Sequence, residues 1–227
     1  MTGEPVQSGP GAGTDAGAAL EPAPLVAHGL CLHLGGRQLI DGIDLVVEPG
    51  ELVGILGPSG AGKTSLLMVL AGVLKPDAGS VSRTGRLGFV PQTLGLSPTS
   101  TASENVALTL QVHRTEKAEM QRRVRASLAA VGLAQHDRIV AELSGGQRAR
   151  VAIARAVALQ PQVLIADEAT AELDVENQRI VMDLFEQAAD AGAAVVLATH
   201  DPLVAERCTR TYLLDDGHLI EGGTLDQ

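Results

Sequence analysis

The residues with the clearest chemical pattern form a glycine-rich loop that ends in a lysine and a threonine. The loop follows the spacing G-x-x-x-x-G-K-[ST] and comprises Gly57, Pro58, Ser59, Gly60, Ala61, Gly62, Lys63 and Thr64, with Ser65 as the next residue. In such a loop, glycines let backbone N–H groups approach phosphate oxygens. The lysine ammonium reaches the β- and γ-phosphates, and the hydroxyl binds Mg²⁺. These nine residues are therefore predicted to bind a nucleoside triphosphate.

The elements around this loop match that chemistry. The apolar run 52–56 predicts a buried strand, and Leu66, Leu67 and Leu70 recur at helical spacing behind the loop. A glycine-rich strand-to-helix turn without a ligand is the alternative. A chance match of the motif is expected in roughly 1% of chains of this length, so phosphate binding is the preferred interpretation.

Charged side chains follow two further apolar runs. Asp167 and Glu168 come after the run 163–166, and His200 follows the run 194–198. Because ligands of open α/β sheets bind at the carboxyl ends of the strands, these side chains are predicted to lie near the phosphate loop. One carboxylate can hold Mg²⁺ while the other orients water. An ordinary acidic pair and a structural histidine are the alternatives.

A second glycine-rich helix start follows Leu143. Ser144 and Gln147 have the S-x-x-Q spacing of a capping box, ahead of a helical pattern through Val157. Two glycines in a first turn, Gly145 and Gly146, cost up to about 1 kcal/mol each in helix propensity. A simple cap is the alternative, but a close approach by an anion explains why glycines stand there.

Composition bounds the class of protein. The 227 residues carry a net charge of −10, which argues against a nucleic-acid partner, and the only aromatic residues are Phe89, Phe185 and Tyr212. Cys31 and Cys208 lack metal-ligand spacing and suit a reduced intracellular protein. No apolar run reaches the 18 residues of a membrane span. We therefore expect a soluble protein that reaches a membrane only through a partner.

The chain divides into a tail and an α/β domain with a helical insert. Residues 1–24 are rich in Gly, Ala and Pro and are predicted to be a disordered tail, and 25–227 form the domain. An antiparallel strand pair is expected before Pro49. Within about 93–152 the pattern is helical, with Ser103 and Thr115 as predicted helix caps. A hairpin turn is predicted at Asp216-Gly217.

Taken together, these motifs resemble those of the ATP-binding cassette (ABC) family. The family's motifs occur in its order: the phosphate loop, the Q-loop glutamine Gln92, the signature Leu143–Gln147, the Walker B run ending in Asp167-Glu168, the D-loop Ala171–Asp174 and the switch histidine His200. The resemblance covers about residues 25–223. It implies a P-loop NTPase fold, in which a RecA-like core carries an antiparallel β-subdomain and an inserted α-helical subdomain.

The resemblance also implies roles for these residues. Glu168 would polarise the attacking water, His200 would contact the γ-phosphate, and Gln92 would sense Mg²⁺ and the membrane partner. Thr64, Gln92 and Asp167 would serve the metal. Two protomers, identical or different, would sandwich two ATP molecules, with Ser144, Gly145, Gly146, Gln147 and Asp174 completing the nucleotide sites across the dimer.

Two positions depart from the family pattern. Ala169 stands where proline usually follows the Walker B glutamate, and Leu34 stands where an aromatic ring usually stacks on adenine. We expect the first change to be mild because alanine can adopt the same φ. The second predicts weak recognition of the base.

Three function classes fit a phosphate loop: an ABC transporter ATPase, a non-transport ABC ATPase and an unrelated kinase or GTPase. The signature argues against the last. DNA-acting members carry a long insertion between loop and signature, for which the interval from Lys63 to Ser144 is too short, and ribosome-acting members carry two cassettes. The resemblance therefore favours a subunit that drives a separate membrane permease at the inner face of the cell membrane. The segments 101–106 and 166–174 look like the lipoprotein-release, macrolide-export and cell-division group.

Overall fold

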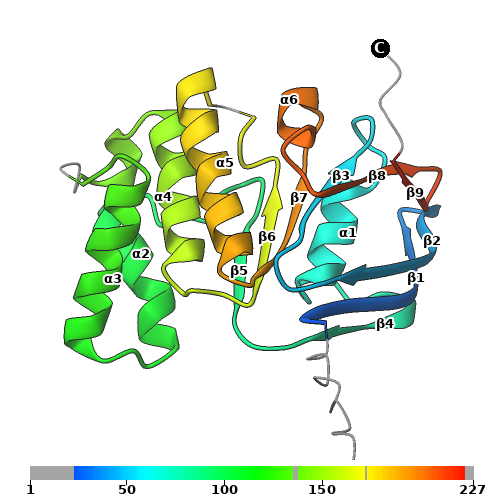
Figure 1. Ribbon diagram of the computed structural model, residues 1–227, viewed down its shortest axis with the longest axis horizontal. Coiled ribbons are helices and arrows are strands. Elements are labelled where there is room, and N and C mark those ends of the chain that lie inside the picture. Colours follow the sequence, from blue (N-terminus) through cyan, green and yellow to red (C-terminus); the bar gives the residue numbers. More distant parts are fainter. Residues whose placement is uncertain (1–22, 135–137, 172, 223–227) are drawn as a thin grey trace, which may run out of the picture.

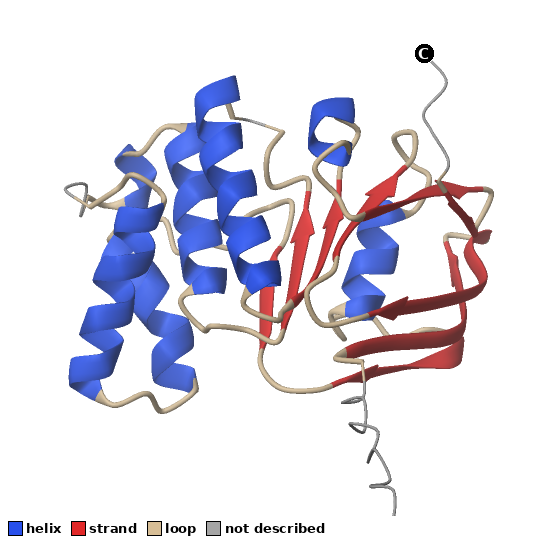
Figure 2. Ribbon diagram, in the orientation of Figure 1, coloured by secondary structure: helices blue, strands red, loops and turns tan. Residues whose placement is uncertain are grey.

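The computed structural model describes residues 23–134, 138–171 and 173–222. The predicted tail falls almost wholly outside these ranges, as does Glu172 of the D-loop. Two sheets and a set of helices make up the described part (Figure 1, Figure 2). The division into a tail and a domain with a helical insert remains a prediction.

The central sheet has six strands in the order β5-β6-β7-β3-β8-β9. These strands are β5 (Leu87–Val90), β6 (Val163–Asp167), β7 (Ala194–Ala198), β3 (Leu52–Leu56), β8 (Arg210–Asp215) and β9 (His218–Glu221). All neighbours are parallel except β8 and β9, which form the predicted hairpin around Asp216-Gly217. Every residue of β3, β6 and β7 is buried. Such continuous apolar runs are typical of parallel strands covered on both faces.

A second sheet of three antiparallel strands packs beside the first. It consists of β2 (Arg37–Val47), β1 (Leu25–Leu34) and β4 (Ala78–Arg83), in that order. The predicted pair before Pro49 is thus confirmed as β1 and β2. The sequence did not predict β4, whose residues are mostly exposed.

Helices cover the central sheet on two sides, and each side has its own core. The helix α1 (Lys63–Leu70) and the three-stranded sheet share one buried cluster, which includes Ile55, Leu66 and Val196. The other cluster lies among α2 (Ala102–Val112), α3 (Lys117–Ala130), α4 (Gly145–Val157) and α5 (Val175–Asp190). A 3₁₀ turn, η1 (Val140–Glu142), precedes α4, and the short helix α6 (Pro202–Ala205) follows β7.

Both predicted caps in the helical segment are wrong by one or two residues. Thr101 caps α2, because it forms a full capping box with Glu104, whereas Ser103 lies inside the helix. Glu116, rather than Thr115, caps α3 and accepts from two backbone N–H groups. In α2 the Thr101 hydroxyl accepts from the first-turn N–H of Glu104, and the Glu104 carboxylate accepts from Thr101 N. In α3 the Glu116 carboxylate itself accepts from the first turn, where the helix dipole also favours it.

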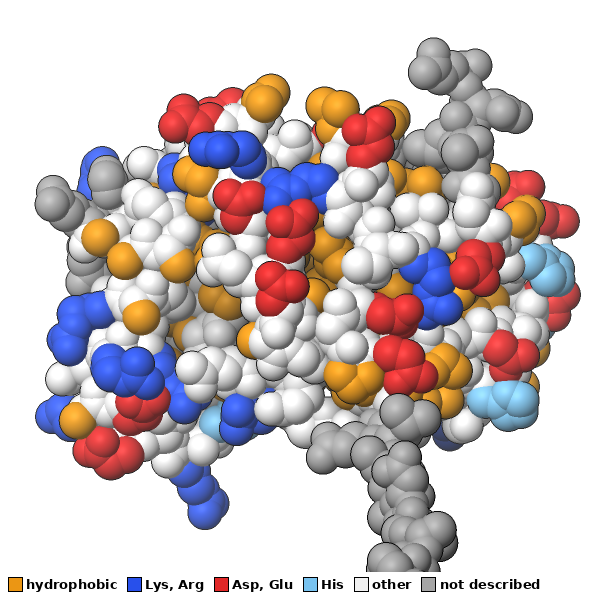
Figure 3. Space-filling view, in the orientation of Figure 1, with side chains coloured by type: hydrophobic (Ala, Val, Ile, Leu, Met, Phe, Trp, Pro, Cys, Tyr) orange, Lys and Arg blue, Asp and Glu red, His pale blue; other side chains and the backbone are white. Residues whose placement is uncertain are grey.

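Charge is unevenly spread over the described surface. In Figure 3, Lys and Arg side chains gather at the left, over α2 and α3, while acidic side chains are more frequent over the sheets. No helix in the described ranges has the length and apolar character to cross a membrane.

Candidate nucleotide-binding site

The parallel sheet brings the predicted site residues to one edge. The phosphate loop follows β3, Gln92 follows β5, Asp167 ends β6 and His200 follows β7. Since β5, β6, β7 and β3 are consecutive and parallel, their carboxyl ends point the same way. Residues that lie far apart in the sequence therefore meet at this edge.

The phosphate loop needs glycine at two positions for steric reasons. Gly57 has φ +151°, and a Cβ there would lie 2.8 Å from the carbonyl oxygen of Leu214. Gly62, the N-cap of α1, has φ +103°, and a Cβ would lie 3.1 Å from the oxygen of Leu39. A side chain would strain both the loop backbone and its neighbours. The loop is thus held tightly between β8 and the start of β2.

Lys63 is buried and points back over the loop. Its side chain is only 6% exposed, and Nζ donates to the carbonyl oxygens of Gly57 at 2.7 Å and Pro58 at 3.1 Å. Nζ also lies 3.9 Å from Glu168 Oε1. A buried ammonium without a close ion pair is well suited to bind an anion. The arrangement holds a positive charge where phosphate oxygens would lie.

Glu168 is the residue on which the other predicted groups converge. Gln92 Nε2 donates to Oε2 at 3.4 Å, and His200 Nδ1 lies 3.6 Å from Oε1. The Glu168 side chain is 22% exposed, and its backbone φ is +48°, a conformation that costs a non-glycine residue energy. Strained backbone of this kind is typical of functional positions.

Asp167 is buried beside the start of α1. Burial raises the pKa of its carboxyl above the ordinary value, and the charge of Glu168 adds to this effect. A hydrogen bond from Thr64 and the charge of Lys63 act in the opposite direction. Among the described residues, Asp167 Oδ1 is buried and has no hydrogen-bond partner. A buried carboxylate oxygen without a hydrogen-bond partner is a suitable ligand for a cation.

These residues fit Mg²⁺ held partly by phosphate. In the ranges that the structure describes, no group of three or more His, Cys, Asp or Glu side chains could hold a metal ion alone. Mg²⁺ usually binds through one or two carboxylates together with substrate phosphates. Asp167 and Thr64 offer one carboxylate and one hydroxyl at the phosphate loop, which suits that mode.

The signature segment lies on a different helix. Ser144 forms the predicted capping box of α4: Gln147 N donates to Ser144 Oγ at 3.3 Å, and Ser144 N donates to Gln147 Oε1 at 3.0 Å. The first N–H groups of a helix have no intrahelical partner, so those of Gly145 and Gly146 are available to an anion. In Figure 1, α4 stands among the other helices while α1 lies behind β3. The signature and the phosphate loop thus begin two different helices, α4 and α1.

The remaining predicted residues are Asp174 and Leu34. Asp174 caps α5, and hydrogen bonds from the backbone and side chain of Asn177 hold the pKa of its carboxyl below the ordinary value. Leu34 ends β1, pairs with Arg37 across the hairpin and is 54% exposed. The hairpin strand β2 touches the phosphate loop at Leu39. Leu34 is therefore exposed at the turn of the hairpin whose second strand contacts the loop.

One hydrogen bond near His200, between Gln178 and Asp201, was not predicted from the sequence. Gln178 Nε2 donates to Asp201 Oδ2 at 2.5 Å, beside His200. The sequence marked Asp201 only as the cap of a helix and gave no sign of Gln178.

Comparison with known proteins agrees with this geometry. The family model described as "ABC transporter" matches residues 40–171, more than half of the chain. A dimeric structure of the ATP-binding cassette MJ0796, in a post-hydrolysis state with ADP and Pi, has a TM-score of 0.81 and 30% identity, and the match covers 89% of this chain and all of that one.

Two curated relatives have different named functions. The methionine import ATP-binding protein MetN of Bradyrhizobium diazoefficiens is 38% identical over 83% of this chain, which spans only 60% of that protein's length. The lipoprotein-releasing system ATP-binding protein LolD 2 of Caulobacter vibrioides is 39% identical over 82% of this chain and 90% of its own. The chain belongs to the ABC transporter family and contains its ATP-binding cassette.

Proposed function

We propose that this chain is the ATP-hydrolysing subunit of an ABC transporter and that it drives the conformational change of separate membrane permease subunits. The observation that carries the proposal is the convergence of Lys63, Gln92 and His200 on Glu168, next to the phosphate loop. A carboxylate in that position can orient water toward the terminal phosphate.

Each residue has a distinct task in this proposal. The loop N–H groups and Lys63 bind the phosphates and stabilise the charge that develops during hydrolysis. Glu168 orients the water, and His200 contacts the γ-phosphate. Thr64 and Asp167 would hold Mg²⁺, with Gln92 nearby, and the bound ion would neutralise phosphate charge.

Completion of the site requires a second cassette. We propose a head-to-tail dimer, of two copies or with a second ABC subunit, in which Ser144 and Asp174 of each protomer act on the nucleotide of the other. The dimeric MJ0796 structures support this arrangement. The permease would hold the dimer at the inner face of the cell membrane.

We propose that the chain belongs to the lipoprotein-release, macrolide-export and cell-division group, because its segments 101–106 and 166–174 resemble those of that group. Identities of 38% to the MetN relative and 39% to the LolD relative do not separate this group from methionine importers. Co-purification with the permease encoded beside this chain, followed by transport assays with lipoprotein and methionine, distinguishes the two.

Glu168→Gln tests hydrolysis directly. We expect ATP binding to persist and turnover to fall by about 10²-fold or more, because the amide cannot accept a proton from water. The ATP-bound variant should be a dimer by light scattering. Removal of Mg²⁺ with EDTA should stop turnover of the wild-type protein.

The matched control is Glu176→Gln, the same change at an exposed position in the first turn of α5. It should turn over ATP like the wild type. Normal hydrolysis by Glu168→Gln would refute the role of this carboxylate, and a monomeric ATP-bound variant would refute a dimer of identical chains.

A further inference from the structure

A single amide side chain connects the first turn of α5 to the loop that carries His200. Gln178 Nε2 donates to Asp201 Oδ2 at 2.5 Å, across a sequence separation of 23 residues. Asp201 directly follows His200. A hydrogen bond to a charged acceptor is stronger than one between neutral groups, so this contact fixes the loop firmly.

The loop is anchored on both sides of His200. On one side, Thr199 is buried and its N–H donates to the oxygen of Ile55 in β3 at 3.1 Å. On the other side, Asp201 Oδ1 accepts from Leu203 N at 2.9 Å while Oδ2 accepts from Gln178. The His200 side chain itself is 62% exposed. Its distance to Glu168 therefore depends on the two anchored neighbours more than on packing of the ring.

Packing does not confine the loop on every side. A cavity of about 200 Å³ lies beside it, lined by Thr170, Leu173, Gln178, His200 and Asp201 among others. Because there is space next to the loop, loss of an anchor gives His200 room to move. A displacement of about 1 Å in a catalytic group can lower a rate by 10²-fold.

The other end of the connection is the D-loop. Gln178 N donates to the oxygen of Asp174 at 2.8 Å, and Asp174 Oδ1 accepts from Asn177 N at 2.8 Å. Gln178 thus lies one helical turn after Asp174. A movement of Asp174 at the dimer interface would be passed through this turn to Asp201.

The segment that follows α6 is held to α5 by a different residue, Arg207. Arg207 donates from Nε to Glu186 at 2.7 Å and from Nη2 to Asp183 at 2.6 Å, two turns further along α5. These ion pairs remain if Gln178 is changed. A variant at Gln178 should therefore stay folded while the loop near His200 loosens.

We propose that Gln178 is a positioning residue for the hydrolysis proposed above. It holds Asp201, and through Asp201 the imidazole of His200, at the correct distance from Glu168, and it links this distance to the position of Asp174. Because Gln178 would act on the position of His200, its effect can be measured both with and without turnover.

The kinetic test first replaces the hydrogen bond between residues 178 and 201 by a repulsion. It then restores the bond with donor and acceptor exchanged. Gln178→Glu places two carboxylates face to face, and we expect kcat to fall about tenfold, with KM for ATP within about twofold because the side chain does not touch nucleotide. Adding Asp201→Asn lets the new amide donate to the new carboxylate, which should restore kcat to within about twofold. Asp201→Asn alone should be mild, because the Gln178 amide can rotate and accept.

Gln187→Glu is the matched control, since it makes the same change at an exposed position of the same helix. It should leave kcat, KM and the thermal midpoint unchanged. Normal kcat in Gln178→Glu, or a double variant no faster than the single one, would overturn the inference.

A spectroscopic test needs no hydrolysis. The chain has six histidines, and the NMR signal of the His200 ring can be assigned by its loss in His200→Ala. We expect Gln178→Glu to shift this signal and the double variant to return it, while the other ring signals stay in place. An unmoved His200 signal overturns the inference. If the wild-type protein does not hydrolyse ATP, the proposed function fails, and this signal alone still decides whether Gln178 positions His200.

Discussion

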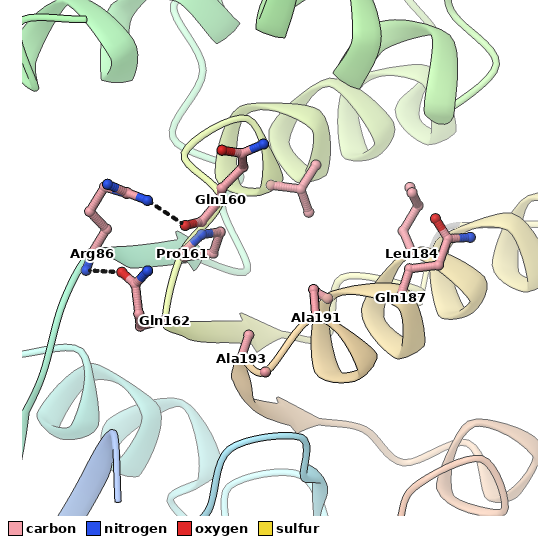
Figure 4. Close-up of a pocket in the computed structure, with 11 residues that line it drawn as sticks. Arg86, Gln160, Pro161, Gln162, Leu184, Gln187, Ala191 and Ala193 are labelled. Atoms are coloured by element: carbon pink, nitrogen blue, oxygen red, sulfur yellow. Dashed lines mark hydrogen bonds between the residues drawn. The ribbon is translucent and has the colours of Figure 1, made fainter. Parts of the chain in front are cut away.

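Charged residues at the two ends of the parallel strands differ in their burial and in their hydrogen-bond partners. At the carboxyl ends, Lys63, Asp167 and Glu168 are partly or fully buried, and at least one oxygen of this group has no partner in the described part of the chain. At the amino ends, Arg86 donates to the oxygen of Leu159 at 2.8 Å. It also donates to the oxygen of Gln160 at 3.0 Å (Figure 4). Both ends bind a cation to backbone oxygens, but among the described residues only at the carboxyl ends does that cation lie beside carboxylates.

A cavity also lies at the amino ends, and it is larger than the one beside His200. It measures about 570 Å³ and is lined by Arg86, Gln162, Leu184, Gln187 and Ala193 among others. Its lining contains none of the residues predicted to bind nucleotide and no carboxylate side chain. Positive φ occurs at both ends, at Glu168 and at Gln160, so it does not separate them. What sets the carboxyl ends apart is a buried carboxylate oxygen without a hydrogen-bond partner in the described ranges, rather than the volume of the cavity.

The largest effect should come from removing the buried cation at the functional end. Lys63→Ala should lower ATP turnover by at least about 10²-fold, because one positioned charge on the developing phosphate charge contributes roughly 3–4 kcal/mol. Equilibrium binding and phosphate release measure this loss. Lys117→Ala, at an exposed position that starts α3, is the control. Wild-type activity in a folded Lys63→Ala protein would refute the site.

Ser144→Arg should also stop turnover, but by acting on the other protomer's nucleotide. The arginine would fill the anion position at the start of α4 and leave the variant's own phosphate loop intact. Mixing Ser144→Arg with Lys63→Ala should recover part of the activity, since the mixed dimer keeps one intact site. Ser144→Thr, which preserves the cap, is the control. Full turnover by Ser144→Arg alone would contradict this role.

A smaller effect is expected where the base would lie. Leu34→Tyr should tighten ATP binding by roughly threefold to tenfold, because stacking of a base on a ring contributes about 1–3 kcal/mol. We expect the lower part of that range because the backbone here positions a leucine and not an aromatic ring. The wild-type protein should bind GTP nearly as well as ATP. Titration of both nucleotides, with Leu34→Met as the control without a ring, measures this. Unchanged ATP affinity in Leu34→Tyr would show that Leu34 does not contact the base.

The smallest effect on turnover should come from the opposite end of the strands. Arg86→Met removes the two hydrogen bonds to carbonyl oxygens, and it should lower the free energy of unfolding by about 1 kcal/mol because the site is exposed. ATP turnover should stay within about twofold of wild type. Urea unfolding and phosphate release measure the two quantities, with Arg179→Met on α5 as the control. A large loss of turnover would show that this end takes part in function.

The sequence predicted best the features that depend on neighbouring residues. The capping box between Ser144 and Gln147 and the hairpin turn at Asp216-Gly217 are confirmed. The strand before the phosphate loop and the helix after it were also predicted, because apolar periodicity and glycine spacing are local signals. The roles of the individual site residues remain predictions, although Lys63, Gln92, Glu168 and His200 do lie together.

Features that depend on distant residues were missed. The strand β4 is small, polar and mostly exposed, and it is a strand because β1 pairs with it. One local feature was missed as well: Thr101 caps α2, because its capping box with Glu104 starts the helix before Ser103. The contact between Gln178 and Asp201 joins residues from separate elements, which no local pattern reveals.

The backbone of Glu168 has a consequence for anyone who engineers this protein. A left-handed φ of +48° costs an ordinary residue about 1–3 kcal/mol, and glycine would avoid most of that cost. A directed-evolution screen for expression or heat resistance alone would therefore reward loss of this carboxylate. Under the proposed role of Glu168, such variants would be inactive, so selection for yield must be combined with selection for phosphate release.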